Sequence, residues 1–184
     1  MGINLEKGQR TGLSQQKFNI GLSWDANETD SGGQFDLDAS VFGLGDTGKI
    51  VSEDYFVFYN HLQTSDKSIT HTGDNQSGAG DGDDETIEVD LSKIDSKVKE
   101  IRVVVTIHDA NNRKQNFGQV RNSKIRIYVP GTNEELLNYE LDEDYSTETA
   151  LEFGRIYNKD DNWKFEAVGS GMAGGLDAFL KKFS

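Results

Sequence analysis

The acidic, glycine-rich stretch at residues 73–85 has the residue types best suited to bind a ligand. It contains five carboxylates and four glycines. Carboxylates about 4 Å apart repel by roughly 4 kcal/mol per pair at an effective dielectric near 20. A calcium ion turns that repulsion into ligation, because calcium accepts six to eight oxygens in flexible geometry and glycines let backbone carbonyls turn inward. Magnesium fits this stretch less well, and a solvated acidic loop without an ion is the open alternative.

Two named calcium motifs do not fit this stretch. With Asp74 at the first position of an EF-hand, Glu85 falls on the twelfth, but Gln76 and Gly78 take positions that need oxygen ligands, and Ala79 replaces the required glycine. Residues 79–84 approximate the nonapeptide repeat of calcium-binding β-helices, yet they occur once, and that architecture needs stacked copies. The predicted site therefore belongs to neither class.

A second acidic group follows a strand-like segment. Alternation that turns Leu37 inward sends Asp36 and Asp38 to the opposite face, about 7 Å apart. With Asp25 before them, these carboxylates predict a metal site, and a solvated strand face is the alternative. Asp109 ends a hydrophobic strand and Asn116 follows a polar loop, so both can add side-chain oxygens.

Other chemistries find little support in the residue pattern. The three histidines lack zincin spacing and cysteine is absent, which disfavours zinc, copper and thiol chemistry. No nucleophile elbow, phosphate loop or His-Glu-x-x-His helix occurs. We therefore predict no catalytic residue and no site for an organic cofactor. The acidic run at 140–144 lacks glycines and is interpreted as a solvated turn outside the site.

Strands must position these side chains, since period-2 alternation recurs along the chain. It predicts long strands at 18–24, 35–41, 87–91, 101–107 and 125–129 and shorter ones at 3–5, 55–59, 68–71, 135–141, 150–157 and 163–168. The fold class expected is mainly β, an antiparallel β-sandwich with a short C-terminal helix.

The C-terminal helix rests on Leu176, Phe179, Leu180 and Phe183, which recur at helical spacing. The glycines at 169–174 match Gly-x-Gly-x-x-Gly, but a Rossmann unit needs a following parallel strand, and the chain ends ten residues later. We expect these glycines to form a tight turn into the helix.

Length and charge limit the possible classes. The 184 residues suit a single domain spanning 1–184, with a net charge of −13 that repels nucleic acid and anionic lipid. The N-terminus lacks a secretory signal, and no apolar run reaches the roughly 20 residues that span a bilayer. A soluble, cytoplasmic protein is expected.

Several segments together resemble the TerD family of tellurium-resistance and stress-response proteins. They are residues 21–25, 35–40, 57–60, 71–75, 80–85, 106–110, 116–120 and 163–165. The resemblance covers nearly the whole chain. It implies a calcium-binding β-sandwich of the bacterial cytoplasm, with TerD-like paralogues and a TerC-type integral-membrane protein as partners.

The resemblance also suggests which residues bind calcium. The matching positions are Asp25, Asp36, Asp38, Asp74, Asn75, Asp81, Asp83, Asp84 and Glu85, with Asp109 and Asn116 as supports. We expect them to be divided between two ions.

The function expected is that of a non-enzymatic protein in which calcium orders acidic loops into a docking surface. Calcium-dependent binding to a membrane surface is the first alternative, although the loops lack basic or large apolar residues for insertion. A metal-assisted hydrolase is the second, and it lacks a positioned base.

Overall fold

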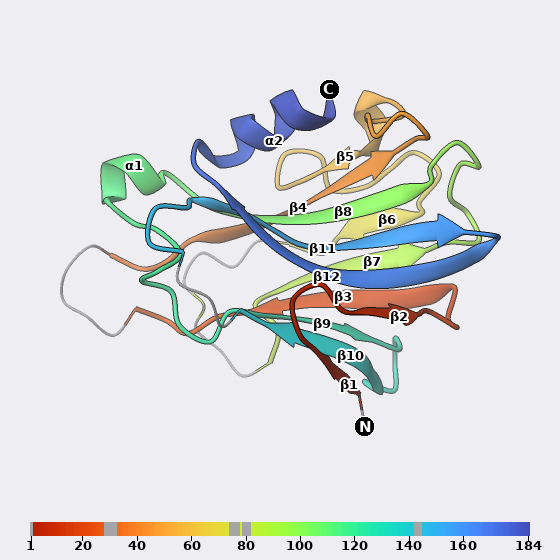
Figure 1. Cartoon of the computed structure of the whole chain (residues 1–184), viewed down its shortest axis with the longest axis horizontal. Coiled ribbons are helices and arrows are strands. Elements are labelled where there is room, and N and C mark those ends of the chain that lie inside the picture. The colour runs from red at the N-terminus through yellow and green to blue at the C-terminus, as the bar shows by residue number, and fades with distance from the viewer. Residues whose placement is uncertain (1, 28–32, 74–77, 79–81, 142–144) are drawn as a thin grey trace.

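Two six-stranded β-sheets pack face to face in the computed structural model, which describes residues 2–27, 33–73, 78, 82–141 and 145–184 (Figure 1). Sheet A contains, in spatial order, β1 (Ile3–Leu5), β10 (Glu135–Glu140), β9 (Lys124–Tyr128), β3 (Lys17–Ser23), β7 (Glu85–Asp90) and β6 (Ile69–His71). Sheet B contains β2 (Arg10–Gly12), β12 (Asn162–Met172), β11 (Ala150–Lys159), β8 (Glu100–Ile107), β4 (Leu37–Leu44) and β5 (Phe56–Val57). The predicted mainly β sandwich is confirmed.

Alternating apolar side chains build the core between the sheets. Phe18 and Ile20 of β3 point inward from sheet A, and Val103 and Val105 of β8 do so from sheet B. All four are at most 2% exposed. The expected period-2 strands are therefore present, because each buries one face in a shared core.

Four features differ from expectation. The pairing of β1 with β10 is parallel, whereas the other strand pairs in both sheets are antiparallel. Strand β2 has only three residues and no apolar alternation, so the pattern did not reveal it. The four-residue helix α1 (Ala110–Arg113) and the 3₁₀ turn η1 (Glu53–Tyr55) are too short for a helical periodicity.

The predicted C-terminal helix is confirmed as α2 (Gly175–Phe183), which covers part of the outer face of sheet B (Figure 1). Phe179 and Phe183 pack there with Phe42 of β4 and Val104 of β8. The glycines before α2 do not all form a turn, since β12 continues to Met172. Within the described residues, no helix is long and apolar enough to cross a membrane.

The ends of the central strands that carry the acidic residues meet at one end of the sandwich. In sheet A, Leu22 pairs with Glu85 and Ser23 with Lys124. In sheet B, Leu37 at the start of β4 pairs with Ile107 at the end of β8. The segments next to these paired residues carry acidic side chains, and we call this end of the sandwich the acidic end.

Candidate functional site

Asp25 and Asp84 line the same cavity at the acidic end of the sandwich. The cavity measures about 390 Å³, and Gly82, Asn122 and Glu140 also border it. Asp25 follows β3 and Asp84 precedes β7, so the antiparallel pairing of these strands brings the two carboxylates together from 59 positions apart in sequence. This pairing joins the two acidic groups that the sequence separates.

Hydrogen bonds hold both carboxylates in place. The Asn122 side-chain amide donates to Asp25 Oδ2 at 2.7 Å, and the Trp24 backbone N–H donates to Asp84 Oδ2 at 3.0 Å. Burial raises the pKa of Asp84, and the neighbouring charges of Asp83 and Asp25 raise it further, against the lowering effect of the Trp24 hydrogen bond. Ionised Asp84 is thus destabilised by its burial and by these neighbouring charges.

Asp83 points away from this cavity and pairs with Arg126 of β9. Arg126 Nε and Nη2 donate to Asp83 Oδ1 and Oδ2, each at 2.8 Å. The bonds form a two-point ion pair on the outer face of sheet A, where Arg126 also lies 4.2 Å from the centre of the Tyr128 ring. The structure therefore gives Asp83 a protein partner.

Glu85 lies inside the sandwich, where it is 2% exposed. Its Oε2 accepts a 2.7 Å hydrogen bond from the Ala39 backbone N–H and lies 3.4 Å from His71 Nε2. The Gly73 N–H donates to His71 Nδ1 at 3.2 Å. Glu85 and His71 thus join sheet A to the start of β4; His71 lies just before the glycine-rich stretch, and Glu85 is its last residue.

Asp36 and Asp38 lie on the outer face of sheet B, as the alternation predicted, but both are buried. They are 7% and 6% exposed. Asp36 Oδ2 is 3.9 Å from Arg113 Nη2, and Asp38 Oδ2 is 3.7 Å from His108 Nδ1. Each of these two carboxylates thus lies near a basic side chain.

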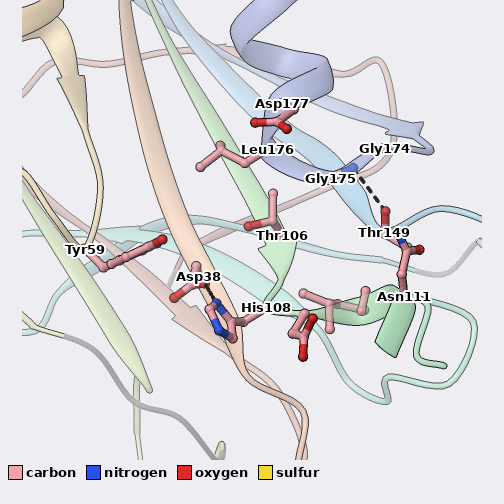
Figure 2. A pocket seen from close by; sticks show the side chains of 13 residues that line it. Asp38, Tyr59, Thr106, His108, Asn111, Thr149, Gly174, Gly175, Leu176 and Asp177 are labelled. Carbon is pink, nitrogen blue, oxygen red and sulfur yellow. Dashed lines mark hydrogen bonds and ion pairs between the residues drawn. The ribbon is translucent and has the colours of Figure 1, made fainter. Parts of the chain in front are cut away.

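Asp38 and Asp109 border another cavity, of about 270 Å³, beneath the first turn of α2. Figure 2 shows Asp38 beside His108 on one side of this cavity, with Asp177 of α2 across from them. Asp109 also accepts a 2.7 Å hydrogen bond from Asn112. Of the predicted acidic residues, Asp25 and Asp84 therefore border one cavity, and Asp38 and Asp109 border another.

The remaining predicted residues can be placed only in part. Asn116 lies on the loop after α1, where its backbone N–H donates to Gln119 Oε1 at 3.0 Å. Asp74, Asn75 and Asp81 lie outside the described residues. Among the residues that the structure does describe, no three Asp, Glu or His side chains form a group that can hold a metal ion.

Two residues with carboxylate or amide side chains in the Asp25–Asp84 cavity, Glu140 and Asn122, were not predicted as site residues. Glu140 belongs to the acidic run interpreted as a solvated turn, and nothing in the residue pattern marks Asn122. The cross-strand register explains why Glu140 borders this cavity. Glu140 pairs with Lys124, and Lys124 in turn pairs with Ser23, which precedes Asp25. Only knowledge of the strand order β10-β9-β3 would have revealed this neighbour.

Several known proteins are similar in sequence to this chain over most of its length. Residues 1–183 match the TerD domain family. General stress protein 16U of Bacillus subtilis (strain 168) is 49% identical over 181 residues, which cover 96% of this chain and 94% of that protein. Tellurium resistance protein TerD of Serratia marcescens is 49% identical over 188 residues, covering 100% and 97% of the two chains.

The solved structures add similarity of fold. A crystal structure of a homologue of telluride resistance protein TerD from Streptomyces coelicolor superposes with a TM-score of 0.73 at 21% sequence identity. The match covers 90% of this chain and 95% of that one.

Proposed function

The chain belongs to the TerD domain family, and from that premise we propose that it is a non-enzymatic calcium-binding protein of a bacterial tellurite-resistance and general stress response. The relatives quoted above carry names of resistance and stress proteins, with no enzymatic activity among them. Tellurium resistance and stress response describe the family, and calcium is our addition to it for this chain.

The observation that carries the calcium proposal is the shared cavity of Asp25 and Asp84. Burial and the charges of Asp83 and Asp25 raise the pKa of Asp84, so its ionised form is destabilised. A divalent cation in the cavity would compensate these charges and would stabilise both carboxylates. The same repulsion would be relieved by protonation at low pH, so calcium and protons should compete there.

The donor set of the cavity suits calcium. Asp25, Asp84 and Glu140 offer carboxylate oxygens and Asn122 offers an amide oxygen, all of which are hard ligands. Lys124 also borders the cavity and balances part of this charge. We propose that Asp74, Asn75 and Asp81 complete the coordination, and that Asp36, Asp38, Asp83, Glu85, Asp109 and Asn116 serve mainly to position the surrounding segments.

Calcium in this role would act by linking strand ends. Asp25 follows β3 and Asp84 precedes β7, so an ion held by these two carboxylates, with further ligands from residues 74–81, would connect two strands of sheet A. Binding to the native state alone stabilises it by about 2.7 kcal/mol at a hundredfold excess over Kd. We propose that the calcium-bound end is the docking surface for TerD-like paralogues and a TerC-type integral-membrane protein.

The first test is thermal unfolding of the full chain in EDTA, magnesium and calcium, together with calorimetric titration of calcium into the metal-free protein. We expect calcium alone to raise the unfolding midpoint, with saturable heat. The Asp25→Asn/Asp84→Asn double variant should lose both effects. Asp160→Asn, a matched change in the exposed β11–β12 turn at the other end of the sandwich, should keep them.

Equal midpoints in EDTA, magnesium and calcium would overturn the calcium proposal. If calcium binds the wild type and the double variant equally well, the ion lies elsewhere in the molecule. A strain whose own copy of this protein is deleted then tests the physiological link, since the wild-type chain should restore growth on tellurite and the double variant should not.

A further inference from the structure

Another cavity lies at the end of the sandwich opposite to the acidic end, where β12 begins. It measures about 500 Å³, and Leu13, Trp163 and Lys164 are among its lining residues. The turn at residues 160–161 joins β11 to β12 there, and Figure 1 shows this turn and helix α1 at opposite sides of the molecule. The volume falls within the roughly 300–1,000 Å³ typical of small-molecule sites, so it exceeds what a simple inorganic ion fills.

Backbone pairing fixes the apolar wall of this cavity. Lys164 pairs with Gly12 of β2, and the Leu13 backbone N–H donates to the Trp163 carbonyl at 2.9 Å. The Leu13 and Trp163 side chains are both partly buried against the main core, so part of each borders the cavity. The indole therefore offers a held apolar surface against which an aromatic ring can pack.

The lining also contains donor groups that have no acceptor within the protein. Within the described part of the chain, neither Lys159 nor Lys164 forms an ion pair. The Trp163 indole N–H and the Ser14 hydroxyl likewise make no hydrogen bond to any residue that the structure describes. Lysine and indole nitrogens can only donate, so a ligand that matches them must carry acceptor oxygens.

The charge of this cavity differs from that of the acidic end. Its lining has two lysines, Lys159 and Lys164, against one carboxylate, Asp160, whereas the proposed calcium cavity has three carboxylates and one lysine. An excess of one positive charge suits a ligand with a single negative charge, because Asp160 repels a doubly charged ligand more strongly. The net charge of −13 on the whole chain acts in the same direction.

We propose that this cavity binds a small aromatic carboxylate. The aromatic group packs against Trp163 and Leu13, the two lysine ammonium groups attract the carboxylate, and the indole N–H and the Ser14 hydroxyl donate to its oxygens. The site goes beyond the calcium function proposed above. The two cavities share no lining residue, so the carboxylate site does not require calcium to bind anywhere in the molecule.

The direct test titrates 1-naphthoate into the ¹⁵N-labelled full chain in EDTA. The chain has two tryptophans, and the indole N–H signal of Trp163 is assigned with Trp163→Phe. We expect saturable shifts of this signal and of the amides of residues 12–14 and 159–164, with a dissociation constant on the order of 1 mM. The signal of Trp24, which is 4% exposed, should stay in place. Shifts confined to Trp24, or no saturable shift, would overturn the proposal.

Matched compounds separate the parts of the ligand. 1-Naphthamide has nearly the same shape without the charge and should bind at least about tenfold more weakly. Acetate has the charge without the ring and should give no saturable shift at the same concentrations. 1-Naphthyl phosphate carries two charges at about pH 8 and should bind no more tightly than 1-naphthoate. Equal affinities for naphthoate and naphthamide, saturable acetate binding or tighter phosphate binding would each contradict an aromatic carboxylate site.

Charge variants then assign the contacts. Lys159→Met and Lys164→Met should each weaken naphthoate binding about threefold and together about tenfold, because each removes one attractive charge. Asp160→Asn should strengthen binding about twofold, since it removes a repulsive charge. Lys97→Met is the matched control and should leave binding unchanged, because Lys97 is exposed at the same end of the sandwich but does not line the cavity. Equal weakening by Lys97→Met and Lys164→Met would show a general attraction to the protein and would overturn the assigned site.

Discussion

Arg126 binds the Asp83 carboxylate through two parallel hydrogen bonds of 2.8 Å, directly over Gly21 of β3. A Cβ atom at position 21 would lie 2.3–2.5 Å from the atoms of that carboxyl group. Glycine therefore makes room for the ion pair, which joins β9 to the residues that precede β7. The pair holds the chain in place immediately before Asp84 in the proposed calcium cavity.

Removing the arginine should destabilise the protein, because Asp83 would keep a largely buried charge without its partner. We expect Arg126→Ala to lower the free energy of unfolding by about 1–3 kcal/mol, measured by urea denaturation. Lys17→Ala is the control. Lys17 pairs with Asp90 at 3.4 Å but its side chain is 68% exposed, so its loss should cost less than about 1 kcal/mol. Equal losses in both variants would contradict the role of the buried pair.

Asp84→Asn should separate stability from calcium binding. Burial and the charges of Asp83 and Asp25 raise the pKa of Asp84, so its ionisation costs stability as the pH rises through the carboxylate range. The amide keeps an oxygen for the Trp24 N–H and removes that cost. In EDTA at neutral pH, the variant should unfold at an equal or higher temperature than the wild type.

The same variant should bind calcium about tenfold more weakly or worse, because ligand charge sets calcium affinity. Calorimetric titration beside the unfolding scans measures both effects on one protein preparation. A variant that loses stability in EDTA yet keeps its calcium affinity would place Asp84 among structural residues.

Gly78 should tolerate no side chain. Its φ is +63°, and a Cβ would lie 2.3 Å from Trp24 Nε1, which donates to the Phe35 carbonyl at 3.1 Å. Left-handed strain and the clash together should make Gly78→Ala less stable by about 2–4 kcal/mol. Urea unfolding followed by tryptophan fluorescence measures this loss.

Gly48 provides the matched control for that substitution. Its φ is +74°, but a Cβ there would meet nothing within 4 Å. Gly48→Ala should therefore cost only the backbone strain, about 1–2 kcal/mol. A Gly78→Ala variant that is no less stable than Gly48→Ala would show that the indole moves aside without cost.

Acid should weaken the protein through Asp66. Burial alone would raise the pKa of Asp66, but hydrogen bonds from Ser68, Tyr55 and Thr64 outweigh it and lower the pKa from 3.8 to about 2. A carboxyl group with a depressed folded pKa stabilises the protein above its unfolded pKa. This contribution is lost as the pH falls from about 4 to about 2.

Urea unfolding between about pH 5 and about pH 2 should show a shallower loss of stability in Asp66→Asn than in the wild type. Asp160→Asn should keep the wild-type slope.

At the alkaline end, burial and the hydrogen bond to Asp66 raise the pKa of Tyr55 from 10.0 to about 12. The folded state prefers neutral Tyr55, so stability should also fall from about pH 10 to about pH 12, and Tyr55→Phe should remove that loss.

Much of the fold could be predicted because its information is local. Phe18, Ile20 and Leu22 alternate with polar residues, and they form the buried face of β3 as expected. The spacing of Phe179 and Phe183 predicted α2 for the same reason. The three-residue β2 and the four-residue α1 escaped, since such short segments contain no full period of either pattern.

The acidic residues show where local information ends. Alternation placed Asp36 and Asp38 on one face of a strand, but it did not reveal that both lie buried beside His108 and Arg113. The sequence pattern also placed Asp83, Asp84 and Glu85 in one acidic group and did not distinguish their roles. In the structure, each of the three has different protein contacts.

The order of residues along the chain by itself determined the strands, the C-terminal helix and the concentration of negative charge in a few segments. Only the tertiary structure decided which carboxylates share a cavity and which have a basic or backbone partner. The physical reason is that side-chain periodicity depends on neighbours within one strand, whereas ion pairing depends on register between strands. Glu140 and Asp25 border the same cavity because β9 pairs with both β10 and β3, although 115 positions separate the two residues in sequence.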